Sequence, residues 1–67
     1  MAITIKAARV NKGLSQEDAA KALGVSKSTI QSYESGKSFP DIPVIKRMED
    51  LYGIQYANLI FLPEKRA

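Results

Sequence analysis

The sequence predicts an all-α fold, a compact bundle of five helices that forms a single domain over residues 1–67. Apolar side chains recur at intervals of three and four residues, which is the spacing of one face of a helix. Capping residues come before these stretches and glycines come after them. No stretch alternates with period two and no Asn-Gly or Asp-Gly turn is present, so we expect no strand. The helices are expected at residues 4–12, 16–23, 27–35, 42–52 and 56–62.

The first expected helix, residues 4–12, is bounded by Thr4, whose hydroxyl can cap its start, and by Gly13. Ile5 and Arg9 fall on one side of this helix because they are four residues apart. We expect that side to face the core.

The second expected helix, residues 16–23, follows Ser15, which can cap it, and Asp18 stands where the reciprocal acid of a capping box lies. Ala20 belongs to its apolar face. Gly24 comes next, and glycine adopts the left-handed conformation that ends a helix without a steric penalty from a Cβ atom. The chain is therefore expected to turn sharply at this glycine.

The third expected helix, residues 27–35, has Ser26 as its cap and a narrow apolar stripe made by Ile30 and Tyr33. Gly36 is the expected left-handed residue after it. The second and third helices thus read as two short helices with a tight corner between them.

The fourth expected helix, residues 42–52, begins after a cap at Asp41 and continues with apolar residues at helical spacing until Gly53. The fifth expected helix is the short stretch 56–62. It ends before Pro63, which cannot continue a helix.

Composition excludes several classes of function. The chain has neither cysteine nor histidine, so it lacks a thiolate nucleophile, the usual proton shuttle and the two commonest transition-metal ligands. We expect no enzymatic activity, no metal, no cofactor and no small-molecule ligand. No apolar run is long enough to span a bilayer and no signal-peptide pattern is present, so we expect a cytoplasmic protein without a membrane partner. The net charge of +3 mildly favours a polyanionic partner.

The residues of the second and third expected helices resemble the helix-turn-helix of the Cro/repressor-type (XRE-like) family of DNA-binding domains. The resemblance is carried by Gln16 at a helix start, Ala20 where two helices cross, Gly24 in the turn, and Val25, Ile30 and Tyr33 as anchors. Glu34-Ser35-Gly36-Lys37 is similar to the E-x-G-K loop of that family. The resemblance implies the fold of the lambdoid repressor DNA-binding domain.

The outer face of the third helix carries the candidate base contacts. The side chains there are polar, uncharged or positive, and such a face taken alone is more often an ordinary solvated surface. A helix of this kind fits the major groove of B-DNA, where serine and lysine can reach base edges. The resemblance places Lys27, Ser28 and Ser32 against bases, with Thr29 and Gln31 as further candidates.

Candidate phosphate contacts flank that helix. Gln16 stands at the start of the second helix, where free N–H groups favour an anion. The resemblance implies that Gln16 contacts a phosphate and supports the first base-contacting residue of the third helix, the recognition helix. The loop after the third helix is a second source of such contacts. The full set of candidates is Gln16, Ser15, Ser35, Lys37 and Lys12.

Glu34 lies four residues after Ile30 and therefore on the buried side of its helix, where an unpaired carboxylate is costly. Arg9 matches the arginine that pairs with this acid in several relatives that the sequence resembles. We expect a partly buried, structural ion pair between Arg9 and Glu34.

Four apolar residues in succession end the fifth expected helix, and a helix can turn only about half of them toward its own core. Either the N-terminal helix covers the others or a second copy packs there as an isologous dimer. We favour a homodimer whose interface includes Leu59, Ile60, Phe61 and Leu62.

The leading interpretation is a sequence-specific DNA-binding transcriptional regulator, a repressor that binds a palindromic operator of double-stranded DNA through the major groove. Two alternatives stay open. One is the antitoxin of a toxin–antitoxin pair with the same fold. The other is a helical protein-interaction module that does not bind DNA.

Overall fold

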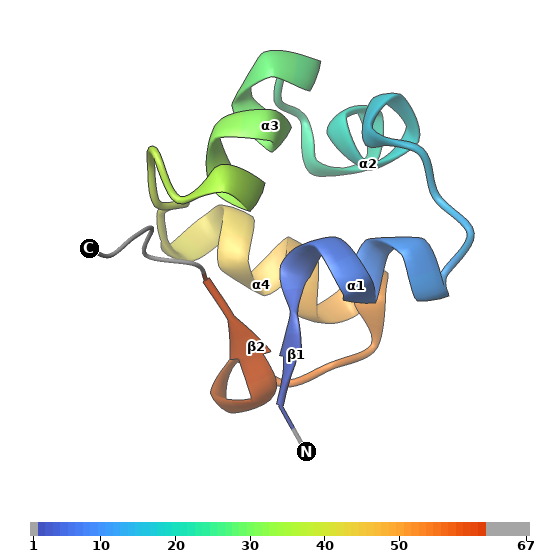
Figure 1. Cartoon of the computed structure of the whole chain (residues 1–67), viewed down its shortest axis with the longest axis vertical. Coiled ribbons are helices and arrows are strands. Elements are labelled where there is room, and N and C mark those ends of the chain that lie inside the picture. The colour runs from blue at the N-terminus through green and yellow to red at the C-terminus, as the bar shows by residue number, and fades with distance from the viewer. Residues whose placement is uncertain (1, 62–67) are drawn as a thin grey trace.

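Residues 2–61 are described by a computed structural model of the chain, and four α-helices are present among them (Figure 1). The elements in chain order are β1 (Ile3–Thr4), α1 (Ile5–Asn11), α2 (Gln16–Leu23), α3 (Lys27–Ser35), α4 (Ile42–Tyr52), the 3₁₀ turn η1 (Tyr56–Asn58) and β2 (Leu59–Ile60). The first four expected helices are therefore confirmed. Only α1 differs in its bounds, because Thr4 is its cap and Lys12 follows its last turn.

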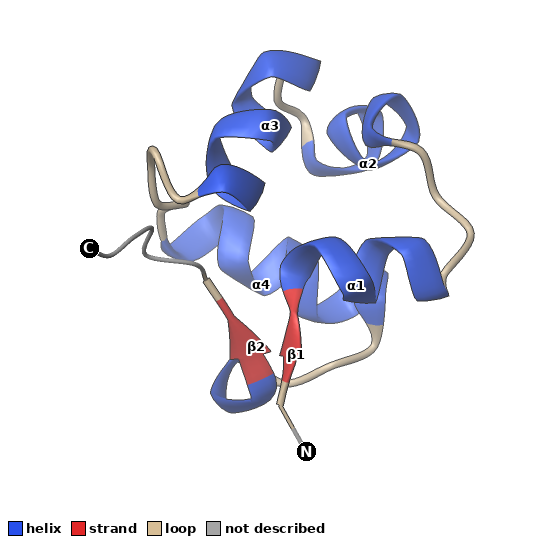
Figure 2. Cartoon of the chain, in the orientation of Figure 1, coloured by secondary structure: helices blue, strands red, loops and turns tan. Residues whose placement is uncertain are grey.

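The expected fifth helix is wrong. Its first residues form the single 3₁₀ turn η1, and the next two form strand β2, which pairs in parallel with β1 (Figure 2). Ile3 lies opposite Leu59 and Thr4 lies opposite Ile60. Two-residue strands are too short to produce an alternating pattern, so the expectation of no strand is also corrected. Leu62, the last residue of the expected helix, lies outside the described residues.

Side-chain caps fix the start of each α-helix. Thr4, Ser15, Ser26 and Asp41 each accept a hydrogen bond from the backbone N–H three residues further on. Asp18 completes a capping box by accepting from the backbone N–H of Ser15 at 3.3 Å. These contacts satisfy N–H groups that have no partner within the helix.

The corner between α2 and α3 depends on Gly24, whose φ angle of +73° lies in the left-handed region. This conformation ends α2 and lets the chain turn within three residues, so that α2 and α3 lie next to each other (Figure 1). Ala19 and Ala20 of α2 are buried, and their small side chains permit a close approach of neighbouring helices.

The core lies between the four helices and is closed below by the strand pair, with α2 and α3 at the upper end of the view and α1 and α4 beneath them (Figure 1). The buried apolar residues that form this core are Ile5, Ala8, Ala19, Ala20, Leu23, Ile30, Val44, Met48, Tyr52 and Leu59, and Ile45 is buried as well. Because β2 contributes Leu59 to this set, the two ends of the described chain are tied into the same core. Among residues 2–61, no helix has both the length and the hydropathy needed to cross a membrane.

Candidate nucleic-acid interface

The outer face of α3 is polar and open to solvent. Its exposed side chains are those of Lys27, Ser28, Gln31 and Ser35, with Ser32 half-buried beside them. Ile30 and Glu34 are buried on the opposite side of the helix. The single carboxylate of α3 therefore points into the protein, and the solvent face carries only neutral or positive groups.

The hydroxyl groups at the start of α3 are held together around its cap. Ser26 Oγ accepts from the backbone N–H of Thr29 at 3.1 Å and also lies 2.8 Å from Thr29 Oγ1. Ser28 Oγ lies 3.2 Å from Ser26 Oγ. Both hydroxyl groups thus bond the cap, and Ser28 is exposed whereas Thr29 is half-buried.

The candidate phosphate contacts are not all brought together. Ser15 Oγ is engaged as the cap of α2. Ser35, the last residue of α3, and Lys37, in the loop after it, are exposed. A Cβ atom on Gly53 would lie 3.6 Å from Lys12 Nζ, so Lys12 stands at the C-terminal end of α4. The negative end of that helix dipole favours a cation. The structure does not group Lys12 with the α3 candidates.

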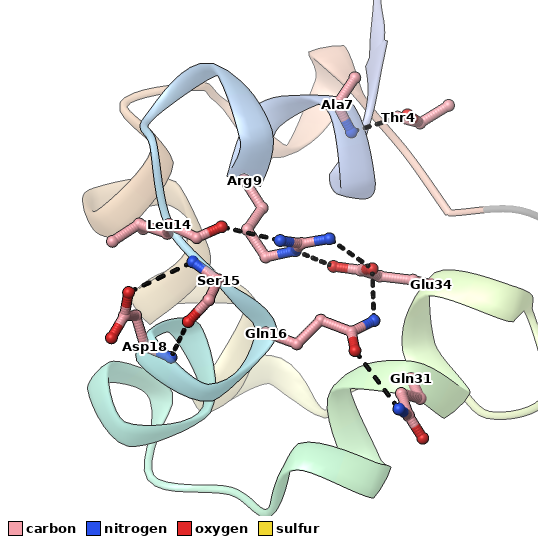
Figure 3. Close-up of polar contacts among 9 residues, drawn as sticks. All are labelled: Thr4, Ala7, Arg9, Leu14, Ser15, Gln16, Asp18, Gln31 and Glu34. Carbon is pink, nitrogen blue, oxygen red and sulfur yellow. Dashed lines mark hydrogen bonds and ion pairs between the residues drawn. The ribbon is translucent and has the colours of Figure 1, made fainter.

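Arg9 and Glu34 form a buried ion pair between α1 and α3 (Figure 3). Arg9 Nε donates to Glu34 Oε2 at 2.7 Å and Nη2 donates to Oε1 at 3.3 Å. A third bond runs from Arg9 Nη1 to the carbonyl oxygen of Leu14 at 2.7 Å. The side chains of Arg9 and Glu34 are 9% and 6% exposed. The hydrogen bond to Glu34 raises the pKa of Arg9 above its ordinary value, although burial opposes this shift.

Gln16 continues this pair toward the outer face of α3 (Figure 3). Its Nε2 donates to Glu34 Oε1 at 3.2 Å, and its Oε1 accepts from Gln31 Nε2 at 3.3 Å. The side chain on α3 that Gln16 supports is therefore Gln31, whereas the resemblance implied support of the first recognition residue. Sequence reasoning missed this contact because the crossing of α2 over α3 decides which side chains meet.

Two further polar groups have structural roles that the sequence did not indicate. Arg47 Nη1 donates to the carbonyl oxygen of Leu23 at 3.1 Å, which ties α4 to the end of α2. Tyr52 is buried near the ion pair. The pKa of Tyr52 is raised to about 12, mainly by burial and also by the charge of Glu34, while the charge of Arg9 opposes the shift. A pattern of apolar spacing cannot distinguish such a tyrosine from an ordinary core residue.

Residues 59–61, the described part of the apolar C-terminal run, are mostly covered by their own chain. Leu59 is buried in the core, and Phe61 packs on Phe39 and Tyr56 with ring centroids 4.9 and 5.7 Å away. Among residues 59–61, which the structure describes, only Ile60 is exposed, at 39%. Leu59 is thus unavailable to a second copy, which corrects that part of the expected dimer interface. Leu59 lies against the N-terminal strand β1 and helix α1, because β2 contacts both of them.

Comparison with known families agrees with this geometry. Residues 5–59 match the helix-turn-helix family, and this match includes all four α-helices. The chain belongs to the helix-turn-helix family. The resemblance to the Cro/repressor type is thereby confirmed. No solved structure gave a significant match.

Three curated relatives are similar to the chain over most of its length. The cryptic phage CTXphi transcriptional repressor RstR of Vibrio cholerae is 34% identical over 84% of this chain and 50% of its own length. Multiprotein-bridging factor 1c of Arabidopsis thaliana is 36% identical over 87% of this chain and 39% of its own. An uncharacterized HTH-type transcriptional regulator of Methanocaldococcus jannaschii is 34% identical over 82% of this chain and 83% of its own. The chain spans half or less of the length of the first two.

Proposed function

We propose that the chain is a sequence-specific, DNA-binding transcriptional regulator that inserts α3 into the major groove of an operator. The observation that carries this proposal is the exposed face of α3, whose only carboxylate, Glu34, is buried behind it. A carboxylate on that face would meet the phosphate-rich surface of a duplex unfavourably, whereas lysine and hydroxyl groups can bond base edges. Two of the relatives, a transcriptional repressor and an HTH-type transcriptional regulator, support the same function.

The base contacts in this proposal come from the first two turns of α3. Lys27 and Ser28 are exposed at its start, and Ser32 lies one turn later. Serine reaches little beyond the backbone, so α3 has to dock closely. Lysine favours the acceptor atoms of guanine, so Lys27 supplies the longer contact.

Phosphate contacts in this proposal lie on either side of α3. The first N–H groups of α2, beside Ser15 and Gln16, form the positive end of a helix dipole. Ser35 and Lys37 stand at the other end of α3. Such contacts fix the position of the protein on the duplex without reading its sequence. Regulation then follows from occupancy in the cytoplasm, as a repressor, and requires no catalysis or cofactor.

The proposed regulator is a homodimer on a palindromic operator, because two copies of a small helix-turn-helix gain affinity when they bind half-sites about 34 Å apart. The surface that favours a second copy surrounds a groove of about 490 Å³ between the loop before α4 and η1. Phe39 and Ile42 are 59% and 65% exposed at this groove. Lys46 and Glu49 also line it, so a twofold axis can pair opposite charges across the interface.

Selection of bound duplexes from a random pool tests the proposed function. We expect the wild-type chain to enrich one motif with two related half-sites. On the winning duplex, Lys27→Ala combined with Ser28→Ala should weaken binding at least about tenfold, the loss of one good base contact.

Lys6→Ala is the matched control, because Lys6 is an exposed lysine on α1 and its loss lowers the net charge by the same amount. It should change binding only slightly. Failure of the wild-type chain to retain any duplex at low salt would contradict the proposal and favour a protein-interaction module.

A further inference from the structure

A continuous row of hydrogen bonds leads from the buried ion pair to the exposed face of α3 (Figure 3). Arg9 donates to Glu34, Gln16 donates to the same carboxylate, and Gln31 donates to Gln16. The side chains become more exposed along the row, from buried Glu34 through half-buried Gln16 to exposed Gln31. The row therefore connects the core to the surface that faces DNA in the proposed function.

The direction of every bond in this row follows from its first acceptor. Glu34 forms an ion pair with Arg9, and the carboxylate of an ion pair only accepts hydrogen bonds. Gln16 must therefore turn its NH₂ group inward to Glu34, which leaves its carbonyl oxygen toward Gln31. That oxygen is also only an acceptor, so Gln31 must present its NH₂ group to it. Among residues 2–61, no other group bonds the carbonyl oxygen of Gln31 or its second N–H.

We propose that Gln31 is a specificity-determining residue that binds adenine in the major groove, and that Gln16 is the positioning residue that sets its orientation. Adenine presents an amino group at N6 and an acceptor at N7, which match the free oxygen and the free N–H of one glutamine amide. Gln31 lies one helical turn after Lys27 on the same exposed face, so it can reach the groove that Lys27 enters. This inference rests on the proposed function.

The orientation matters because an amide, unlike a hydroxyl group, cannot reassign its donor and acceptor by rotating a proton. A glutamine free to flip presents either end to a base. Held through Gln16, Gln31 presents one pattern before DNA arrives, so little side-chain entropy remains to be lost on binding. The ion pair thus contributes to base recognition although neither Arg9 nor Glu34 is exposed.

The test compares the motifs selected from a random duplex pool by the wild-type chain, Gln31→Met and Gln16→Met. Methionine keeps the length of the side chain and removes its hydrogen bonds. We expect Gln31→Met to lose the preference for adenine at one position of each half-site, with a loss of about tenfold in affinity for that base over the others. Gln16→Met should reduce the same preference and leave the other positions unchanged.

Replacement of that adenine by 7-deazaadenine tests the contact at the level of one atom, because it removes N7 and keeps the N6 amino group. The wild-type chain should lose several-fold in affinity for the modified duplex, and Gln31→Met should lose nothing further. Gln55→Met is the matched control, since Gln55 is an exposed glutamine in the loop after α4. Its motif should equal that of the wild-type chain.

The outcomes separate this inference from the proposed function. If the wild-type chain enriches no motif, the proposed function itself fails. If it enriches a motif that Gln31→Met leaves intact, or if the affected position selects a base other than adenine, the base contact is overturned. If only Gln31→Met alters the position while Gln16→Met, folded with an unchanged melting curve, does not, the positioning role of Gln16 is overturned.

Discussion

At the scale of single residues, the Arg9–Glu34 ion pair joins α1 to α3. Its position could be inferred from the sequence, because Glu34 follows Ile30 by one helical turn. Removal of one partner leaves the other as a buried, uncompensated charge. We predict that Glu34→Ala lowers the free energy of unfolding by about 3–5 kcal/mol, measured by urea denaturation at pH 7.

Asp50→Ala is the matched control for this prediction, since Asp50 is an exposed carboxylate and such substitutions change stability by about 0.5 kcal/mol or less. Replacement of both partners by apolar residues, Arg9→Met with Glu34→Leu, should restore much of the loss because no charge is left unpaired. Equal stability of Glu34→Ala and Asp50→Ala would show that the pair contributes nothing.

Tyr52 gives the molecule a defined response to alkaline pH. Its pKa is about 12 in the folded protein, mainly because the side chain is buried, and about 10 in an unfolded chain. The folded state holds this proton more tightly, so its contribution to stability is complete below pH 10 and is lost as the pH rises toward 12. We predict that the free energy of unfolding of the wild-type chain falls by about 2 kcal/mol by pH 12 relative to that of Tyr52→Phe. Tyr52→Phe is the matched control because it keeps every other titratable group. Parallel pH profiles of the two proteins would contradict this.

The partner of Gln16 shows where residue-level inference from the sequence stops. The sequence places Gln16 at a helix start and Gln31 on an outer face, and both placements agree with the structure. Their contact depends on the angle and offset at which α2 crosses α3, which no periodicity within one helix encodes. The same limit applies to Arg47, whose bond to Leu23 joins α4 to α2.

At the scale of elements, local signals predicted α2, α3 and α4 because each has its own cap and its own terminating glycine. The stretch after Gly53 has no such signals. Gln55, the residue before η1, makes no side-chain cap, and the pairing of β2 with β1 joins segments more than fifty residues apart. A short apolar run is compatible with either a helix or a strand, and its distant partner made it a strand.

The corner between α2 and α3 provides an element-scale prediction. A Cβ atom on Gly24 would meet only Arg47 Nη1, at an ordinary contact distance of 3.8 Å, so Gly24→Ala adds backbone strain without a clash. The left-handed conformation costs a non-glycine residue about 1–2 kcal/mol. We predict a loss of this size in the free energy of unfolding, measured by urea denaturation.

Gly24→Asn is the informative companion variant, because asparagine adopts the left-handed conformation more readily than alanine. It should lose less stability than Gly24→Ala. If alanine and asparagine are equally destabilising, the strain at φ +73° is not the cause of the loss.

At the scale of the whole molecule, the two proposed surfaces lie on different elements. The DNA-facing surface is on α3, and the self-association surface is made by the loop before α4, the start of α4 and η1. Ile42 is 65% exposed at the second surface and adds nothing to the core, so Ile42→Lys should leave the fold intact. We predict that the wild-type chain associates to a dimer with rising concentration in sedimentation equilibrium, whereas Ile42→Lys remains a monomer. Their melting curves at low concentration should coincide.

Separate surfaces also predict separate effects on DNA binding. Ile42→Lys keeps every α3 side chain, so its affinity for a single half-site should equal or slightly exceed that of the wild-type chain, since it carries one more positive charge. On a complete palindrome the wild-type chain should bind more tightly by at least about tenfold, because the second copy binds as part of one assembly. An Ile42→Lys variant that still dimerises would move the interface elsewhere. A monomeric wild-type chain that binds the palindrome no better than a half-site would show that each copy reads its half-site alone.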